Sequence, residues 1–132
     1  MAGRLLYLDS SALVKLVVPE PETKALRDSL RSWPERLSSV VALIEVERVA
    51  RRIGGGAMRR ARTVMSRIAL MELDEEVVRT AASLDPPTLR TLDAIHLASA
   101  LSLRVELGVV CAYDGRLAAA ASSKGIEVTG PS

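Results

Sequence analysis

The segment LLYLDSSALVKL, residues 5–16, joins a short apolar run to a polar turn and then to a second apolar run. Leu5–Leu8 is typical of a parallel strand that is buried on both faces, because such strands lack alternating polar residues. Asp9 follows at once, although a buried carboxylate is costly unless hydrogen-bond donors or a cation balance it. Ser10 and Ser11 favour the start of a helix with a serine as its N-cap. The segment therefore predicts a strand that leads directly into a helix.

The rest of the chain repeats this alternation. Further short apolar runs lie near Leu37 and in IALMELD, GVVCAYD and IEV, which are residues 68–74, 108–114 and 126–128. Segments with the apolar spacing of helices separate them, and they span residues 20–30, 40–53, 57–69, 74–84, 88–105 and 115–125. Strands separated by helices imply right-handed crossovers and a parallel sheet that is covered on both faces. We predict one α/β domain over residues 1–132, a three-layer α/β/α fold with a central, mostly parallel sheet.

Composition limits the class of protein. The 132 residues suffice for one domain, and 48% apolar with 26% charged residues is a globular balance. The single cysteine, Cys111, excludes an intrachain disulfide and favours a reducing cytoplasm. No apolar run approaches the ~20 residues of a membrane span, and the start MAGRLLYLDSS reaches an aspartate too early for a signal peptide. We expect a soluble cytoplasmic protein that does not bind membranes.

Four acidic residues occupy positions that are otherwise apolar. Asp9 and Asp114 each end a predicted strand, so both belong to the carboxyl edge of the sheet, where open α/β folds place their sites. Glu45 and Asp93 interrupt helical segments rich in core residues, and Asp93 lies near the start of its helix. Each acid alone could be a helix cap or part of a solvated surface. Together they predict a shared acidic site.

Clustered carboxylates repel one another, so some would hold protons at neutral pH unless a cation offset the charge. Mg²⁺ or Mn²⁺ prefers oxygen ligands and is commonly held by one or two carboxylates together with water. A site of this kind suits the hydrolysis of a phosphodiester. The acidic cluster therefore indicates a metal-dependent nuclease.

Four segments resemble the signature segments of PIN-domain ribonucleases, in particular the VapC-like toxins of type II toxin–antitoxin pairs. They are LLYLDSSALVKL, SSVVALIEVERVARR, LRTLDAIHLASAL and VVCAYDGRL, at residues 5–16, 38–52, 89–101 and 109–117. They span nearly the whole chain in the order that the family shows. LDAIHLASA is the most specific of these matches.

The resemblance implies a Mg²⁺- or Mn²⁺-dependent endoribonuclease with four catalytic acids: Asp9, Glu45, Asp93 and Asp114. Asp9, Asp93 and Asp114 would be its metal ligands. The resemblance also implies an RNA substrate, a toxin homodimer and a cognate VapB-like antitoxin that inserts a peptide into the active groove. The chain departs from the family at Ala112, where many relatives carry Thr or Ser. It departs again just after Asp114, where some relatives carry another acid.

Residues beside the acids have two possible roles. Ser10 could bind substrate phosphate or metal-bound water, although capping the helix is the favoured alternative. Arg90 and Arg116 could hold a phosphate beside the metal. We expect His96 to be a hydrogen-bonded structural residue and not the general base. The densest basic stretch either positions an RNA backbone or forms a solvated helix surface, and it comprises Arg48, Arg51, Arg52, Arg59, Arg60, Arg62 and Arg67.

Two other functions stay open at this point. A receiver-like signalling domain also gathers acids around Mg²⁺ on a parallel sheet, and Asp74 would then accept the phosphoryl group. Ser10 disfavours this hypothesis because receivers usually carry a second acid there. A non-catalytic PIN-fold module that binds RNA is the other alternative, and Ala112 keeps it open.

Overall fold

The computed structural model describes residues 3–132, which form five strands and seven α-helices. In chain order these are β1 (Leu5–Leu8), α1 (Ser10–Val17), α2 (Thr23–Leu30), β2 (Arg36–Ser39), α3 (Val40–Ile53), α4 (Ala57–Met65), β3 (Ala69–Met71), α5 (Glu75–Ser83), α6 (Thr91–Ser102), β4 (Leu107–Cys111), α7 (Gly115–Ser123) and β5 (Val128–Thr129). A short 3₁₀ turn, Arg104–Glu106, precedes β4. None of the helices described is long and apolar enough to cross a membrane.

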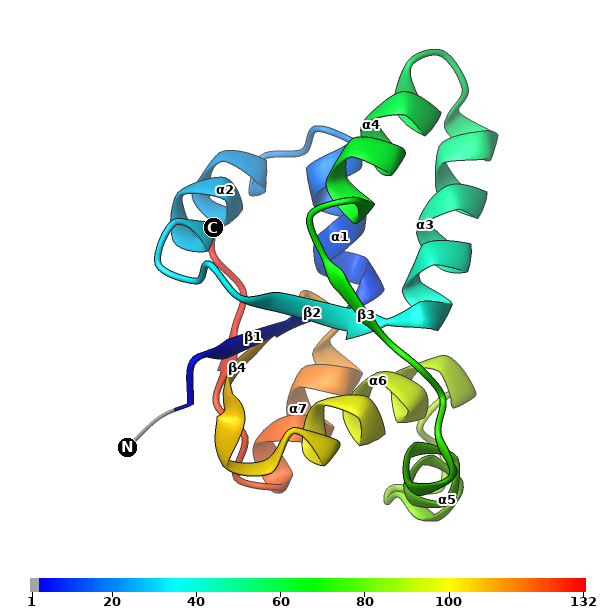
Figure 1. The fold of residues 1–132 in the computed structure, drawn as a ribbon, viewed down its shortest axis with the longest axis vertical. Helices are drawn as coiled ribbons and strands as arrows, with labels where there is room; N and C mark the ends of the chain where they lie inside the picture. The colour runs from blue at the N-terminus through cyan, green and yellow to red at the C-terminus, as the bar shows by residue number, and fades with distance from the viewer. Residues whose placement is uncertain (1–2) are drawn as a thin grey trace.

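The five strands form one sheet in the order β3-β2-β1-β4-β5, and every pair is parallel. Helices α1 to α4 cover one face of the sheet, and α5 to α7 cover the other (Figure 1). The predicted three-layer α/β/α fold is therefore confirmed. The chain builds the sheet outward from β1 to β3 and then returns to add β4 on the other side of β1. The pair β1–β4 is thus the point where the strand order reverses, and open α/β folds place their sites at such a point.

Side chains of β1 supply both layers of the core. Leu6 and Leu8 belong to the apolar cluster that includes residues of α1 to α4. Tyr7, between them, points to the opposite face and packs with Leu97 and Val110. All of these side chains are buried, and each buried leucine contributes about 2 kcal/mol by removing apolar surface from water. The continuous apolar run that identified β1 in the sequence follows from this burial on both faces.

Aspartates begin three of the helices, and a glycine ends another. Asp9, Asp74 and Asp114 accept hydrogen bonds from backbone N–H groups in the first turns of α1, α5 and α7. The predicted serine cap of α1 is therefore wrong, because the carboxylate of Asp9 stands one residue earlier in extended backbone and takes that position. Helix α3 ends at Gly54, whose φ of 79° favours glycine.

Candidate active site

The ends of β1 and β4 are tied together around Asp9. The Asp9 N–H donates to the carbonyl oxygen of Cys111 at 3.1 Å. The Asp9 carboxylate is only 2% exposed and accepts from Ala12 N–H at 3.0 Å and from the Ser11 hydroxyl at 2.7 Å. Ser11 Oγ in turn accepts the Tyr113 N–H at 2.9 Å. The donors that a buried carboxylate requires thus come from the first turn of α1, and the same contacts fix the end of β4 beside it.

Asp114 follows β4 and combines a structural role with a position in the site. Its Oδ1 accepts from the N–H groups of Arg116 at 2.9 Å and Leu117 at 3.2 Å, which caps α7. The cap uses Oδ1 only. A carboxylate that caps a helix in this way keeps its other oxygen for a ligand.

Glu45 is held by two side-chain donors. Ser10 Oγ donates to its Oε2 at 3.0 Å, and His96 Nε2 lies 2.8 Å from its Oε1. His96 Nδ1 lies 2.7 Å from the Tyr7 hydroxyl. The prediction that His96 is a hydrogen-bonded residue is confirmed by these two contacts, and the structure shows that its side chain is only 1% exposed. Ser10 does not cap α1 but links that helix to α3.

Asp93 interacts electrostatically with each of the other three acids. Burial raises the pKa of Asp9 above its ordinary range, and the charge of Asp93 raises it further, although hydrogen bonds from Ser11 and Ala12 lower it. Burial is also the largest effect that raises the pKa of Asp93. Repulsion from Asp114 comes next, and Glu45 adds to it. The carboxylates of residues 9, 45, 93 and 114 therefore share one site at the carboxyl edge of the sheet.

This set of donors suits a hard divalent cation. All four groups offer carboxylate oxygen, which Mg²⁺ and Mn²⁺ prefer, and a cation would relieve the repulsion that raises the pKa of Asp93. Within residues 3–132, no three Asp, Glu, His or Cys side chains converge closely enough to hold a metal ion by themselves. A Mg²⁺ site needs no such cage, because one or two carboxylates with water suffice.

Comparison with known proteins identifies the family. The model of the PIN domain family matches residues 6–122. The chain belongs to the PIN-domain family. Ribonuclease VapC46 of Mycobacterium tuberculosis is 46% identical over 127 residues, a match that covers 96% of this chain and 98% of the relative. Ribonuclease VapC47 of the same species is 36% identical, and the match covers 96% of this chain and 97% of that relative.

Solved structures share the PIN fold. A toxin–antitoxin complex from Klebsiella pneumoniae matches with a TM-score of 0.75 and 19% identity, over 96% of this chain and 98% of that one. The sarcin–ricin loop cleaving toxin VapC20 of Mycobacterium tuberculosis matches with a TM-score of 0.73 and 18% identity, over 96% and 99% of the two chains. Asp74, the acceptor in the receiver hypothesis, caps α5 of this PIN domain with Val77 N–H at 2.8 Å. The family assignment removes the receiver alternative.

A pocket of about 390 Å³ opens at the acidic site of the PIN domain, and Ser10, Glu45 and Asp114 line it. Lys15 lines it as well, although the sequence did not single this residue out. Its Nζ lies 2.5 Å from Glu20 Oε2 and 4.7 Å from the centre of the Tyr113 ring. No motif in the sequence marks Lys15, because only the loop between α1 and α2 brings Glu20 back to it.

The two arginines proposed to bind phosphate differ in their placement. Arg90 precedes α6 and lies near enough to Asp93 to lower the pKa of that carboxyl. Arg116 donates its backbone N–H to Asp114. The side chain of Arg116 lines a separate pocket with Pro86 and Leu89. The structure thus brings Arg90 to the acids, whereas the Arg116 side chain lies beside the loop before α6.

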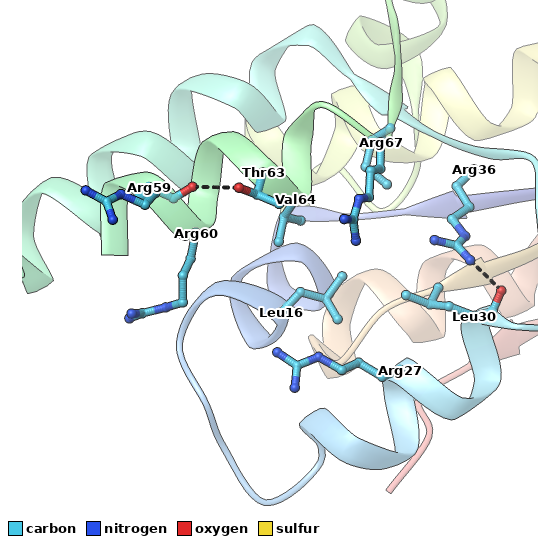
Figure 2. A pocket seen from close by; sticks show the side chains of 10 residues that line it. Leu16, Arg27, Leu30, Arg36, Arg59, Arg60, Thr63, Val64 and Arg67 are labelled. Atoms are coloured by element: carbon cyan, nitrogen blue, oxygen red, sulfur yellow. Dashed lines mark hydrogen bonds between the residues drawn. The ribbon is translucent and has the colours of Figure 1, made fainter. Parts of the chain in front are cut away.

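Part of the basic stretch lines a second pocket, of about 450 Å³, near the C-terminal end of α1. Figure 2 shows the Arg67 side chain above Leu16 and the Arg27 side chain below it, on opposite sides of the pocket. No Asp or Glu is among the lining residues, which are Leu16, Arg27, Leu30, Arg36, Arg59, Arg60, Thr63, Val64, Arg67 and Ile68. Two of these arginines bind backbone carbonyls, as Arg36 does to Leu30 at 2.8 Å. The others give this face a concentrated positive charge.

Proposed function

We propose that this PIN domain is the toxin of a VapBC-type pair and that it hydrolyses RNA phosphodiester bonds with Mg²⁺ or Mn²⁺ as its cofactor. One observation carries the proposal: the carboxylate of Asp93 lies within electrostatic reach of those of Asp9, Glu45 and Asp114, at the reversal of strand order. Relatives that are 46% and 36% identical over nearly the whole chain bear the name ribonuclease, which supports the same reaction.

The residues of this chain would divide the work of the reaction. Asp9, Asp93 and Asp114 would hold the divalent ion, one or two of them directly and the rest through water, and the ion when bound lowers the pKa of water and offsets charge on the phosphate. Glu45 lines the pocket with a carboxylate that Ser10 orients, so it can align the attacking water. Arg90, close to Asp93, would bind a phosphate oxygen.

The proposed partners follow from the surface and from the relatives. A structural relative with the same fold was solved as a toxin–antitoxin complex, so we propose a VapB-like antitoxin whose peptide enters the active groove. Exposed Leu73 and Val78 flank an apolar pocket of about 480 Å³ between α5 and α6. Such a surface favours a homodimer.

The buried free thiol of Cys111 suits a reducing cytoplasm.

Substitution of the acids tests the proposed reaction. Asp93→Asn and Asp9→Asn each remove one charge, and we expect RNA cleavage to fall by about 100-fold or more in each variant because the cation loses a ligand. Asn at the position of Asp9 still caps α1, since Asn and Asp are comparable N-caps. The folds should therefore persist, as circular dichroism would show. Sequencing of RNA ends after expression without the antitoxin would identify both the activity and its target.

Asp74→Asn is the matched control, because Asp74 caps α5 as Asp9 caps α1 but lies beyond the edge strand β3. This variant should cleave RNA and inhibit growth like the parent chain. Full cleavage by folded Asp93→Asn protein would refute the proposal.

A non-catalytic RNA-binding PIN module is the second candidate, and Ala112 supports it. Ala112 is 4% exposed and packs in the cluster with Tyr7, so this position gives the site no hydroxyl. Titration with Mn²⁺ separates the two functions. The nuclease should bind Mn²⁺ and lose that binding in Asp93→Asn, whereas the module would bind weakly or not at all.

A further inference from the structure

A chain of hydrogen bonds next to the acidic site joins β1 to helices on both faces of the sheet. It begins at Tyr7 in β1, passes through His96 in α6 and ends at Glu45 in α3. Tyr7 is fully buried, and the His96 side chain is 1% exposed. The two rings also pack edge to face, with centroids 5.8 Å apart and an interplanar angle of 70°. None of the reaction steps above uses either aromatic side chain.

The chemistry of the three groups fixes the direction of this chain. A carboxylate has no proton to donate, so His96 Nε2 must carry the hydrogen that it shares with Glu45 Oε1 at 2.8 Å. In a neutral imidazole Nδ1 is then the acceptor, and the Tyr7 hydroxyl donates to it at 2.7 Å. Burial raises the pKa of Tyr7, which keeps its proton in place.

Glu45 depends on these donors for its orientation. Its Oε1 accepts from His96 and its Oε2 accepts from Ser10, while the side chain remains 21% exposed toward the pocket. Glutamate has three rotatable bonds, so a carboxylate without such contacts would sample several positions. Two fixed donors, one per oxygen, hold it in one.

We propose that Tyr7 and His96 are positioning residues that act through Glu45: Tyr7 selects the Nε2–H tautomer of His96, and His96 with Ser10 holds the Glu45 carboxylate for RNA cleavage. This inference rests on the proposed function and extends it to residues that do not touch the substrate. Groups that orient the residues of a metal site in this way commonly contribute 10- to 100-fold to activity.

Three variants test the effect on cleavage. Tyr7→Phe removes one hydroxyl and should lower kcat by about 10-fold with KM changed by no more than about twofold, because substrate binding is not altered. His96→Leu should lose more, since Glu45 Oε1 then lacks its donor and only Ser10 still holds the carboxylate. His96→Gln should recover part of the activity of His96→Leu, because its amide N–H can reach the same oxygen. Ser102→Ala is the control, because Ser102 lies in α6 like His96 but outside the acidic pocket: its hydroxyl donates to the Ser99 carbonyl at 2.6 Å, and its loss should leave kcat unchanged.

The tautomer gives a readout that does not depend on activity. In ¹⁵N NMR spectra of the folded parent chain, His96 should show a protonated Nε2 and an unprotonated Nδ1, and Glu45→Gln should shift the Nε2–H resonance. A protonated Nδ1, an unshifted Nε2–H resonance, or Tyr7→Phe and His96→Leu proteins that cleave like the parent would each overturn the inference. Equal losses in His96→Gln and His96→Leu would also overturn it, since they would indicate a role in packing only. If the parent cleaves no RNA, the proposed function fails, and the spectra alone decide whether His96 holds Glu45.

Discussion

Asp9 shows how one side chain can be both a structural cap and a functional acid. Its backbone N–H donates a hydrogen bond to the end of β4, and its carboxylate accepts hydrogen bonds from α1. Burial and the charge of Asp93 nevertheless raise the pKa of this carboxyl. The cap lowers the cost of the buried charge but does not remove it. The remaining cost is what a divalent cation would relieve, so the stability of the apo chain should depend on pH and on metal.

We predict that the apo chain becomes less stable as the pH rises above about 4, the ordinary pKa of an aspartate. Asp9 and Asp93 have raised pKa values in the folded chain, so the folded chain binds more protons than the unfolded one above the ordinary aspartate pKa of about 3.9. The free energy of unfolding therefore falls as the pH rises above that value. Mn²⁺ should raise the melting temperature more at pH 8 than at pH 5, as thermal denaturation would measure.

Asp93→Asn provides the comparison for this pH effect. The variant removes one repelling charge, so its melting temperature should fall less between pH 4 and pH 8 and respond less to Mn²⁺. Identical pH profiles for Asp93→Asn and the parent would contradict the electrostatic account of the site.

At the scale of the elements, the order of strands and helices could be predicted from the sequence, whereas several helix ends differ by three or four residues, as at α4, predicted over residues 57–69 and observed over Ala57–Met65. The apolar run at residues 5–8 predicted a buried strand, and β1 is buried there. The glycine at position 54 predicted the end of α3, and its φ of 79° is a conformation that favours glycine. The cap of α1 was mispredicted because Asp9, Ser10 and Ser11 are all good N-caps, and only the backbone geometry decides among them. The hydrogen bond between Tyr7 and His96 joins residues 89 positions apart, and no local pattern predicts it.

Helix α7 allows the two roles of Asp114 to be separated. Asp114→Ala removes the acceptor for two N–H groups and should lower the free energy of unfolding by about 1 kcal/mol. Asp114→Asn keeps the cap and should be nearly as stable as the parent, as urea denaturation would show. Both variants lose a carboxylate, and both should cleave RNA more slowly. An active Asp114→Asn protein would instead mean that Asp114 serves only as the cap of α7.

At the scale of the molecule, the sequence predicted that Asp9 and Asp114 share the carboxyl edge of the sheet, since both follow parallel strands, and the structure adds that β1 and β4 are adjacent. Glu45 and Asp93 were recognised by their apolar surroundings and by resemblance, and the side chains that hold Glu45 became visible only in the structure. The arginine pocket near the C-terminal end of α1 could not be predicted either. Its arginines come from α2, β2 and the α4 region, which are adjacent only in three dimensions.

This pocket leads to a prediction about RNA binding. Arg27 and Arg67 lie on opposite sides of it, and neither forms an ion pair in residues 3–132. If they contact RNA phosphates, the double variant Arg27→Gln/Arg67→Gln should bind RNA more weakly, because fewer counterions are released. The slope of log K against log salt should shrink by about 1.4, at about 0.7 per phosphate contact on a single strand. Fluorescence anisotropy with an RNA oligonucleotide, in an Asp93→Asn background that prevents cleavage, would measure both quantities.

The double variant Arg79→Gln/Arg104→Gln is the charge-matched control, because it removes the same two charges elsewhere. Arg79 lies 2.8 Å from the Glu75 carboxylate, and Arg104 lies 2.6 Å from the Glu76 carboxylate. These carboxylates offset the positive charge of the two arginines. Removing them should change the salt slope little. An equal loss in the two double variants would show that RNA responds to net charge alone. An unchanged slope in Arg27→Gln/Arg67→Gln would exclude the pocket from the RNA-binding surface.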